Sequence, residues 1–390
     1  MATRRSTRIS NRSETSDVEM GDVSGRRTSS SSPTKKPKDT RPPHVDPPEY
    51  EVVGDAFIQN TYDSHLNKRD LKNYLKKIQI NIINENHKEN TIEFDLINVE
   101  TSIANALRRI MIAEVPTMAL EKIYLYQNDT VFQDEVLCHR IGLMPIKADA
   151  RQFEWPSNPV VDTNVGNREI YEEPYGDPKQ NLVFEVKMKC QKKKLVPVDA
   201  TNKDEHFENA VVKSKHFHWV PIGNQAQIFK DDPPKMVHDD IVILKMRHGQ
   251  EIEARCHAVK GIGRDHAKFS PVGTASYRLL PEIILKETIT GERAVRLQKS
   301  FSKGVIKLDD EGTAYVADSR ADTLSRNVFR YDDLKDAVEI KRKKNHFIYS
   351  IESTGQYPAD EIFTESCKVM LSKLREFRKG LQDLAKAAKK

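Results

Sequence analysis

The chain has 390 residues, of which 37% are hydrophobic and 31% are charged, and its formal net charge is +5. This length allows two or so domains, and the mild charge excludes a protein that binds nucleic acid over its whole surface. The four cysteines are widely spaced and no apolar run reaches the ~20 residues that cross a bilayer. We therefore expect a protein of a reducing, intracellular compartment with no membrane partner.

Residues 1–48 are rich in Ser, Thr, Arg and Pro and contain very few large apolar side chains. Such a composition cannot bury enough surface to offset its chain entropy, so we predict a disordered basic tail. The basic run from Pro33 to Lys38 has two interpretations, a nuclear import signal or a solvated charged segment.

The folded part is expected to begin near Tyr50. Apolar and polar residues alternate over 78–82 and again over 92–96, which predicts two half-buried strands joined by a hairpin. A helix follows, with Thr101 or Ser102 as its cap, and it must end just before Pro116 because proline disfavours helical geometry at the preceding residue.

Strands and helices then alternate in an irregular order that is typical of the α+β class. Further strands are expected at 119–126, 182–188, 252–258 and 347–351, with a short helix at 134–142. Loop-rich stretches separate them at 150–180 and 191–240, and the glycines at 261 and 263 are expected in a tight turn.

The C-terminal helix gives the clearest pattern in the sequence. Its apolar residues repeat at spacings of four and three and form a heptad seam: Phe363, Cys367, Met370, Leu374, Phe377, Leu381 and Leu384. Two interpretations remain open, a helix packed on its own domain or a partner interface. On either interpretation Cys367 is expected to be a small buried apolar residue.

The residues that catalysis would require are not grouped in this sequence. Adjacent carboxylates such as Asp231 and Asp232 point to opposite faces of an extended chain, which makes them poor metal ligands. His216, His218 and Cys256 lack the paired spacing of a structural zinc site. We therefore predict no catalytic residue and no metal ligand. The basic runs 192–194 and 341–344 are expected to be solvated, with a weak nucleic-acid contact as the alternative.

Three blocks of sequence, 100–116, 133–145 and 261–278, resemble the α-subunit family of cellular RNA polymerases. Within that family the chain is most similar to the α-like subunit shared by eukaryotic RNA polymerases I and III, and the RNA polymerase II paralogue is the main alternative. That paralogue carries a cysteine-clustered zinc loop, whereas Cys138, Cys190 and Cys256 are far apart here. The resemblance therefore implies no zinc in this chain.

The resemblance also implies a fold. A dimerisation domain split into 49–119 and 262–390 would be interrupted by an insertion domain at 120–261, with a long C-terminal helix. A smaller α-like subunit would form a heterodimer with it, and the second-largest and largest subunits would then dock. The implied interface residues are Leu107, Arg108, Arg109, Ile110, Phe363, Met370, Leu374, Phe377, Leu381 and Leu384.

The implied function is that of a non-catalytic assembly platform. Arg108 and Arg109 would contact the second-largest subunit as a pair, with solvent exposure as the alternative, and DNA would be reached only through the assembled enzyme. The family places such a subunit in the nucleus, and in the nucleolus for RNA polymerase I, supporting synthesis of ribosomal RNA, 5S RNA and tRNA. A different class, a nucleic-acid-binding module that uses the basic tail, is the other alternative.

Overall fold

The computed structural model of the chain describes residues 50–55, 58–59, 71–156, 176–193 and 206–388. The predicted tail at 1–48, its basic run, and most of the predicted loop at 150–180 lie outside these residues. Among the helices of the described ranges, none combines the length and the apolar character that crossing a bilayer requires.

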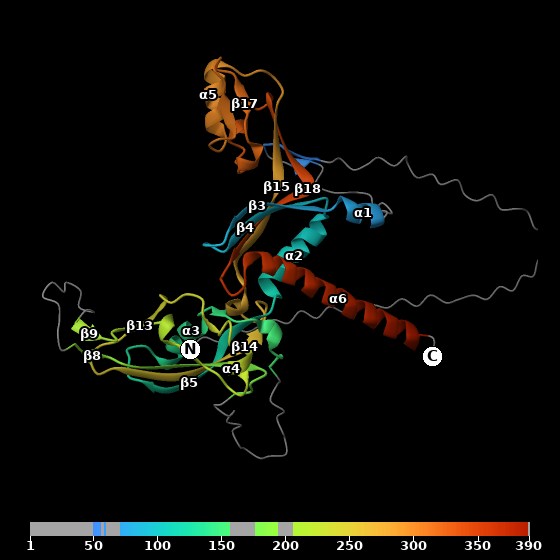
Figure 1. The fold of residues 1–390 in the computed structure, drawn as a ribbon. Coiled ribbons are helices and arrows are strands. Elements are labelled where there is room, and N and C mark those ends of the chain that lie inside the picture. The colour runs from blue at the N-terminus through green and yellow to red at the C-terminus, as the bar shows by residue number, and fades with distance from the viewer. Residues whose placement is uncertain (1–49, 56–57, 60–70, 157–175, 194–205, 389–390) are drawn as a thin grey trace, which may run out of the picture. The chain divides into compact units, whose positions relative to one another are not determined.

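One long strand, β18 (Val338–Ser353), organises the largest sheet, and all its neighbours run antiparallel to it. β15 (Val272–Leu285) pairs along one side of β18, while β4 (Thr91–Ile97) and β1 (Tyr50–Val53) share the other side. Two edge strands complete the sheet: β3 (Gln79–Asn86) beyond β4, and β2 (Ile58–Gln59) beyond β1. Segments far apart in the sequence therefore meet on one strand (Figure 1).

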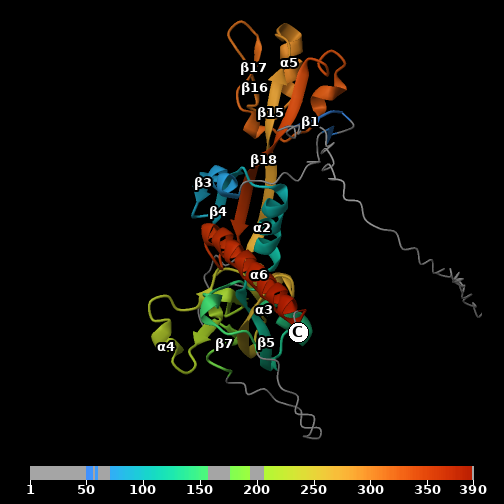
Figure 2. The same ribbon diagram turned by 90° about the vertical axis from the view of Figure 1, so that its right-hand side faces the viewer.

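Two helices, α2 (Thr101–Ala113) and α6 (Ala359–Ala387), pack against each other and on one side of this sheet (Figure 2). α2 ends before Pro116, as the sequence predicts, because the chain turns there into the next strand. The predicted caps are wrong: Glu100 occupies the N-cap position, and its side chain makes no capping hydrogen bond. The Tyr349 hydroxyl of β18 donates to the Ala104 carbonyl, which fixes α2 on the sheet.

The alternation predicted for 92–96 is confirmed, because Ile92, Phe94 and Leu96 of β4 are all buried beneath the helices. The strand predicted around 78–82 also forms, as β3, with the short helix α1 (Leu71–Lys77) before it. However, Ile80 and Ile82 are 52% and 62% exposed, so the expectation of a half-buried strand is wrong for them. β3 lies at the sheet edge, where less of the chain covers it.

A second sheet has the order β11-β7-β14-β5 and confirms three more predicted strands. Its members are β5 (Thr117–Asn128), β7 (Asn181–Lys189), β11 (His218–Val220) and β14 (Glu251–Gly261). The predicted helix at 134–142 is α3 (Asp134–Gly142), which packs on β5. Buried residues from both sheets belong to one apolar cluster, and the described elements lie in one compact unit, Pro47–Lys390.

Residues 286–337 leave the main sheet at the end of β15 and return to it at the start of β18. They hold α5 (Gly291–Ser300), β16 (Ile306–Leu308) and β17 (Ala314–Val316), with the short helices η5 (Ser319–Ala321) and η6 (Asn327–Arg330). Their apolar residues form a core of their own, which also takes in Val53, Ile283, Val338 and Ile340 of the sheet. This 286–337 segment therefore packs on the end of the sheet that lies away from α6.

The remaining elements are short and border the second sheet. They are β6 (Ile146–Lys147), η1 (Ala150–Gln152), β8 (Gln191–Lys192), β9 (Phe207–Glu208), β10 (Val211–Lys213), η3 (Ser214–His216), α4 (Gln225–Ile228), β12 (Lys235–Met236), β13 (Val242–Lys245) and η4 (Ala267–Phe269).

The end of α2 lies directly against the turn that follows β14. The Arg264 amide donates to the Ala113 carbonyl at 2.8 Å, so the turn is hydrogen-bonded to the C-terminal end of the helix. A Cβ atom at Gly263 would overlap the Ile112 carbonyl oxygen, which explains why glycine stands there. The predicted turn is thus confirmed for Gly263, which lets two backbones approach closely, whereas Gly261 is the last residue of β14.

Replacing Gly263 by alanine is expected to lower the free energy of unfolding by roughly 1–3 kcal/mol, because the turn must move away from α2. Thermal or urea unfolding followed by circular dichroism measures the change. Gly380→Ala is the control: a methyl group added there on α6 would meet no described atom within 4 Å, so it should leave stability equal or slightly raised. Equal stability of Gly263→Ala and the wild type would contradict this account.

Candidate partner interface

Helix α6 has a covered first part and an uncovered second part. Ala359, Ile362 and Ser366 are buried, whereas every residue from Leu371 to Ala388 is exposed. The uncovered part is about 27 Å long at the usual rise per residue. Its large apolar side chains are 46–69% exposed: Leu371, Leu374, Phe377, Leu381 and Leu384. A helix with such a stripe in water is typical of a surface that a partner covers.

The first part of the predicted seam packs within this chain. The Phe363 ring lies 4.9 Å from the Phe94 ring and 6.3 Å from the Tyr349 ring, in edge-to-face contacts. Met370 is partly buried against the same core, whereas Cys367 is exposed, so the prediction of a buried cysteine is wrong. The first residues of the heptad pattern therefore pack against this chain's own core. The later residues form a second apolar surface that the described chain leaves uncovered.

The interface residues predicted on α2 differ in their surroundings. Leu107 and Ile110 are 6% and 5% exposed, so their side chains are already covered within this chain. Arg108 is partly buried and donates to Asn105 Oδ1 from Nε and Nη2, at 3.1 and 2.9 Å. Among these four residues of α2, Arg109 is the one that is exposed.

A second exposed apolar surface, on β3, was not predicted as a site. Ile80 pairs with Leu96 and Ile82 with Phe94, so both isoleucines lie on the side of the sheet that carries the helices. Cross-strand partners share one face of a sheet, and here the face continues past the helices to the edge strand. The alternation itself contained this signal, but it could not show which strand would lie at the edge.

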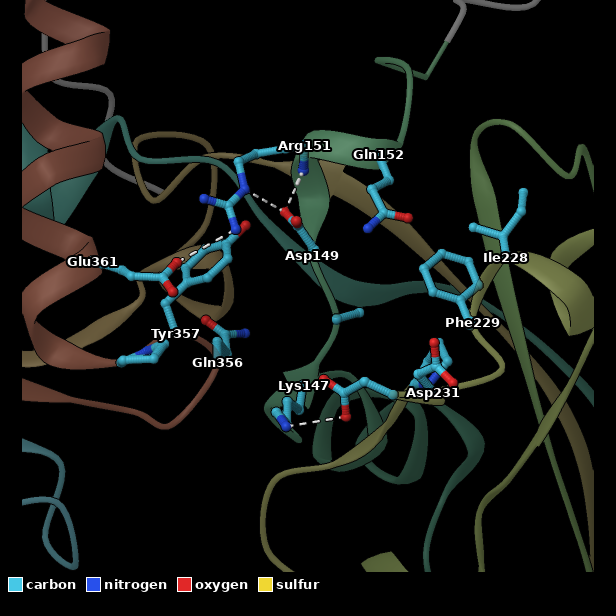
Figure 3. Close-up of a pocket in the computed structure, with 14 residues that line it drawn as sticks. Lys147, Asp149, Arg151, Gln152, Ile228, Phe229, Asp231, Gln356, Tyr357 and Glu361 are labelled. Atoms are coloured by element: carbon cyan, nitrogen blue, oxygen red, sulfur yellow. Dashed lines mark hydrogen bonds and ion pairs between the residues drawn. The ribbon is translucent and has the colours of Figure 1, made fainter.

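Arg151 fixes the start of α6 to the region of the second sheet (Figure 3). Its Nε lies 2.7 Å from Asp149 Oδ1, its Nη1 3.0 Å from Glu365 Oε1, and its Nη2 3.4 Å from Glu361 Oε2. Burial acts to raise the pKa of Asp149, but the hydrogen bonds from Arg151 outweigh it and hold that pKa below its ordinary value. No sequence motif marks the contact with α6, because Arg151 lies more than two hundred positions before Glu361 and Glu365.

Tyr357 completes this anchor just before the helix. Its hydroxyl accepts from the Ala150 amide and donates to the Pro116 carbonyl, both at 3.1 Å. Burial raises the pKa of Tyr357 to about 12, so the hydroxyl stays protonated and keeps donating at physiological pH. The residue therefore ties together the end of α2, η1 and the start of α6.

A cavity of about 430 Å³ opens beside this anchor, between Tyr357, Arg151 and Phe229 (Figure 3). Three of its carboxylates are engaged in ion pairs: Asp149 and Glu361 with Arg151, and Asp232 with Lys147 at 3.1 Å. Within the described ranges, no three His, Cys, Asp or Glu side chains converge on a common point where they could hold a metal ion.

The basic run at 341–344 lies inside β18, not before a strand as predicted. Lys341 is 3.6 Å from Glu339, Arg342 pairs with Glu51, and Lys344 is 7% exposed. These three side chains are ion-paired or buried, so the run does not form an exposed basic face that could bind nucleic acid.

Comparison with known proteins gives a consistent assignment for the region that carries these features. Residues 93–374 match the RNA polymerase Rpb3/Rpb11 dimerisation domain. The chain is 42% identical to DNA-directed RNA polymerases I and III subunit RPAC1 of Mus musculus over 334 residues, 85% of this chain and 89% of the relative.

Two further relatives separate the branches of this family. The RPAC1 subunit of Saccharomyces cerevisiae is 42% identical over 79% of this chain and 88% of its own length. Subunit 3 of DNA-directed RNA polymerases II, IV and V of Arabidopsis thaliana is 29% identical over 75% of this chain and 88% of its own length. The preference for the RNA polymerase I and III branch, first drawn from the cysteine spacing, is confirmed by this difference.

The Arg151 anchor makes a pH-dependent contribution to stability. The pKa of Asp149 is lowered in the folded chain, so its ionised form favours folding above the ordinary aspartate pKa of ~3.9 and loses this effect as pH falls through the folded value. Asp149→Asn, which keeps an oxygen that can accept from Arg151, should flatten the acid side of a plot of midpoint temperature against pH. Parallel profiles for variant and wild type below about pH 5 would contradict the assignment.

Proposed function

Since the chain belongs to the RNA polymerase Rpb3/Rpb11 dimerisation family, we propose that it is a non-catalytic assembly subunit of RNA polymerases I and III. It forms a heterodimer with a smaller α-like subunit, and the pair is the platform on which the second-largest and largest subunits dock. The observation that carries the proposal is the uncovered apolar stripe of α6, which follows directly on a firmly anchored first part.

The size of this stripe sets a requirement for the partner. Five side chains that are about half exposed would gain roughly 4–8 kcal/mol on full burial, at ~1.5–3 kcal/mol for a complete side chain. Association costs ~4–15 kcal/mol in lost translational and rotational freedom. Burial of the α6 stripe alone therefore leaves little net binding free energy. A stable pair needs a second apolar contact, and the exposed Ile80 and Ile82 of β3 offer one.

The binding of the large subunits requires a surface that the heterodimer does not cover. Arg109 is exposed on α2 while its neighbours Leu107 and Ile110 are buried, which supports its part in the contact of the arginine pair with the second-largest subunit. Phosphodiester chemistry then belongs to the large subunits, and this chain supplies geometry and binding free energy. The proposed location is the nucleus, with the nucleolus for the RNA polymerase I pool, and the products are ribosomal RNA, 5S RNA and tRNA.

Co-expression with a small α-like subunit tests the interface. The double variant Leu374→Asp and Phe377→Asp should abolish the one-to-one complex, because two charges would be buried in an apolar contact. The matched control, Ser372→Asp with Lys379→Gln, changes the net charge by the same amount on the opposite side of the exposed helix and should leave the complex intact. Affinity purification followed by light scattering gives the mass; a complex that survives the first variant would rule out the stripe as the interface.

The absence of zinc from this chain remains a prediction that rests on the cysteine spacing. Cys138, Cys190, Cys256 and Cys367 lie far apart in sequence, and Cys190 and Cys256 are buried. Elemental analysis of the purified chain should therefore give far less than one zinc ion per molecule. A stoichiometric, chelator-resistant zinc ion would contradict the prediction and favour a site like that of the RNA polymerase II paralogue.

A further inference from the structure

Arg320 on η5 joins the 286–337 segment to the outer side of the main sheet. Arg320 Nη1 lies 2.7 and 3.0 Å from the two carboxylate oxygens of Asp95, and its Nη2 lies 2.6 Å from Glu93 Oε1. Both carboxylates belong to β4, more than two hundred residues earlier in the chain. Two-point hydrogen bonding of this kind is among the strongest that arginine makes, and it fixes orientation as well as distance.

Neighbouring strands reinforce this contact. His346 Nε2 of β18 lies 2.9 Å from Asp95 Oδ2, and Arg278 Nη1 of β15 donates to the Arg320 carbonyl oxygen at 2.6 Å. The Asp95 and His346 side chains are only 9% and 13% exposed. Three strands of the sheet thus contribute to one charged cluster around η5.

Ile348 shows what the cluster covers. Phe347 and Tyr349, on either side of it in β18, point into the core beneath the helices, so Ile348 points to the opposite side of the sheet. On that outer side Ser350 and Glu352 are exposed, yet Ile348 is only 2% exposed. Its neighbours across the sheet are Asp95 and Arg278, and both contact Arg320.

The loop that follows η5 is strained. Leu324 and Arg326 both have left-handed backbone angles, with φ values of 58° and 59°. Residues other than glycine adopt this region at a cost, and it persists only where surrounding contacts impose it. A strained backbone held down by a charged contact is the arrangement expected of an element that can open.

We propose that Arg320 is a releasable latch that holds the 286–337 segment against the outer side of the main sheet. In the closed state, Arg320 joins η5 to Glu93 and Asp95 and covers Ile348. In the open state, the strain at Leu324 and Arg326 is relieved, and Ile348 and the two carboxylates become accessible. The apolar core of the segment keeps it attached to the far ends of β15 and β18 in both states.

Hydrogen exchange of the full chain, read by mass spectrometry, distinguishes a latch from a static contact. Arg320→Gln should speed amide exchange over 318–326 roughly tenfold or more, since the lost hydrogen bonds are to charged groups. Arg320→Lys should fall between, because lysine cannot join two carboxylates with the same fork. Raising salt from about 0.05 M to about 0.5 M should speed exchange in the wild type by less than the Arg320→Gln substitution does, because salt screens partly buried charges only weakly.

The control is Arg296→Gln, which removes an ion pair with Asp333 inside the same segment, at 2.7 Å, and should leave 318–326 unchanged. The proposal is overturned if Arg320→Gln exchanges no faster than Arg296→Gln, or if exchange in the wild type is indifferent to salt. Neither result bears on the α6 interface, so this test and the test of heterodimer formation can fail independently.

Discussion

The start of α6 is the constraint on which the proposed interface depends. Arg151 holds Glu361 and Glu365, Tyr357 links the start of the helix to η1 and to the end of α2, and Phe363 packs on Phe94. A helix fixed through its first turns continues in the direction that those turns define. The apolar residues that follow are therefore held away from the sheet. Their side chains cannot become buried by folding back onto this chain.

The two sides of β4 serve different parts of the molecule. Phe94 points toward α6, while Glu93 and Asp95 point outward to Arg320 of the 286–337 segment. Successive residues of a strand alternate in this way, so one short strand contacts both the helix layer and the connecting segment. A shift of β4 by one residue would exchange the two faces and disrupt both contacts together.

The sequence contains most of the local structure and little of the long-range assembly. Helical spacing and a proline predicted the extent of α2, and the short helix predicted at 134–142 is α3, because such signals act within a few residues. The exposure of Ile80 could not be predicted, since alternation is the same in a central strand and an edge strand. Arg151, Tyr357 and Arg320 carry no local signal at all, because their partners are brought near only by the complete fold.

The heptad seam shows the same limit in a single element. Its spacing correctly indicates one apolar side of α6, yet Phe363 is used within the chain and Phe377 is left uncovered. Spacing reports that a residue faces something apolar, and it does not report to which molecule that surface belongs. The family resemblance supplied what the pattern could not, a reason to expect a second subunit.

The central position of β18 also dictates when the sheet can close during synthesis. β4 pairs through Ile97 with His346, so about 250 residues must be added before its partner exists. At ~5–20 residues per second this interval is roughly 10–50 s, during which the apolar face of β4 has no native neighbour on the β18 side. The apolar stripe of α6 is synthesised after β18. All strands of the sheet that anchors α6 therefore exist before the stripe does. The nascent chain thus has more need of a chaperone for its early strands than for its final helix.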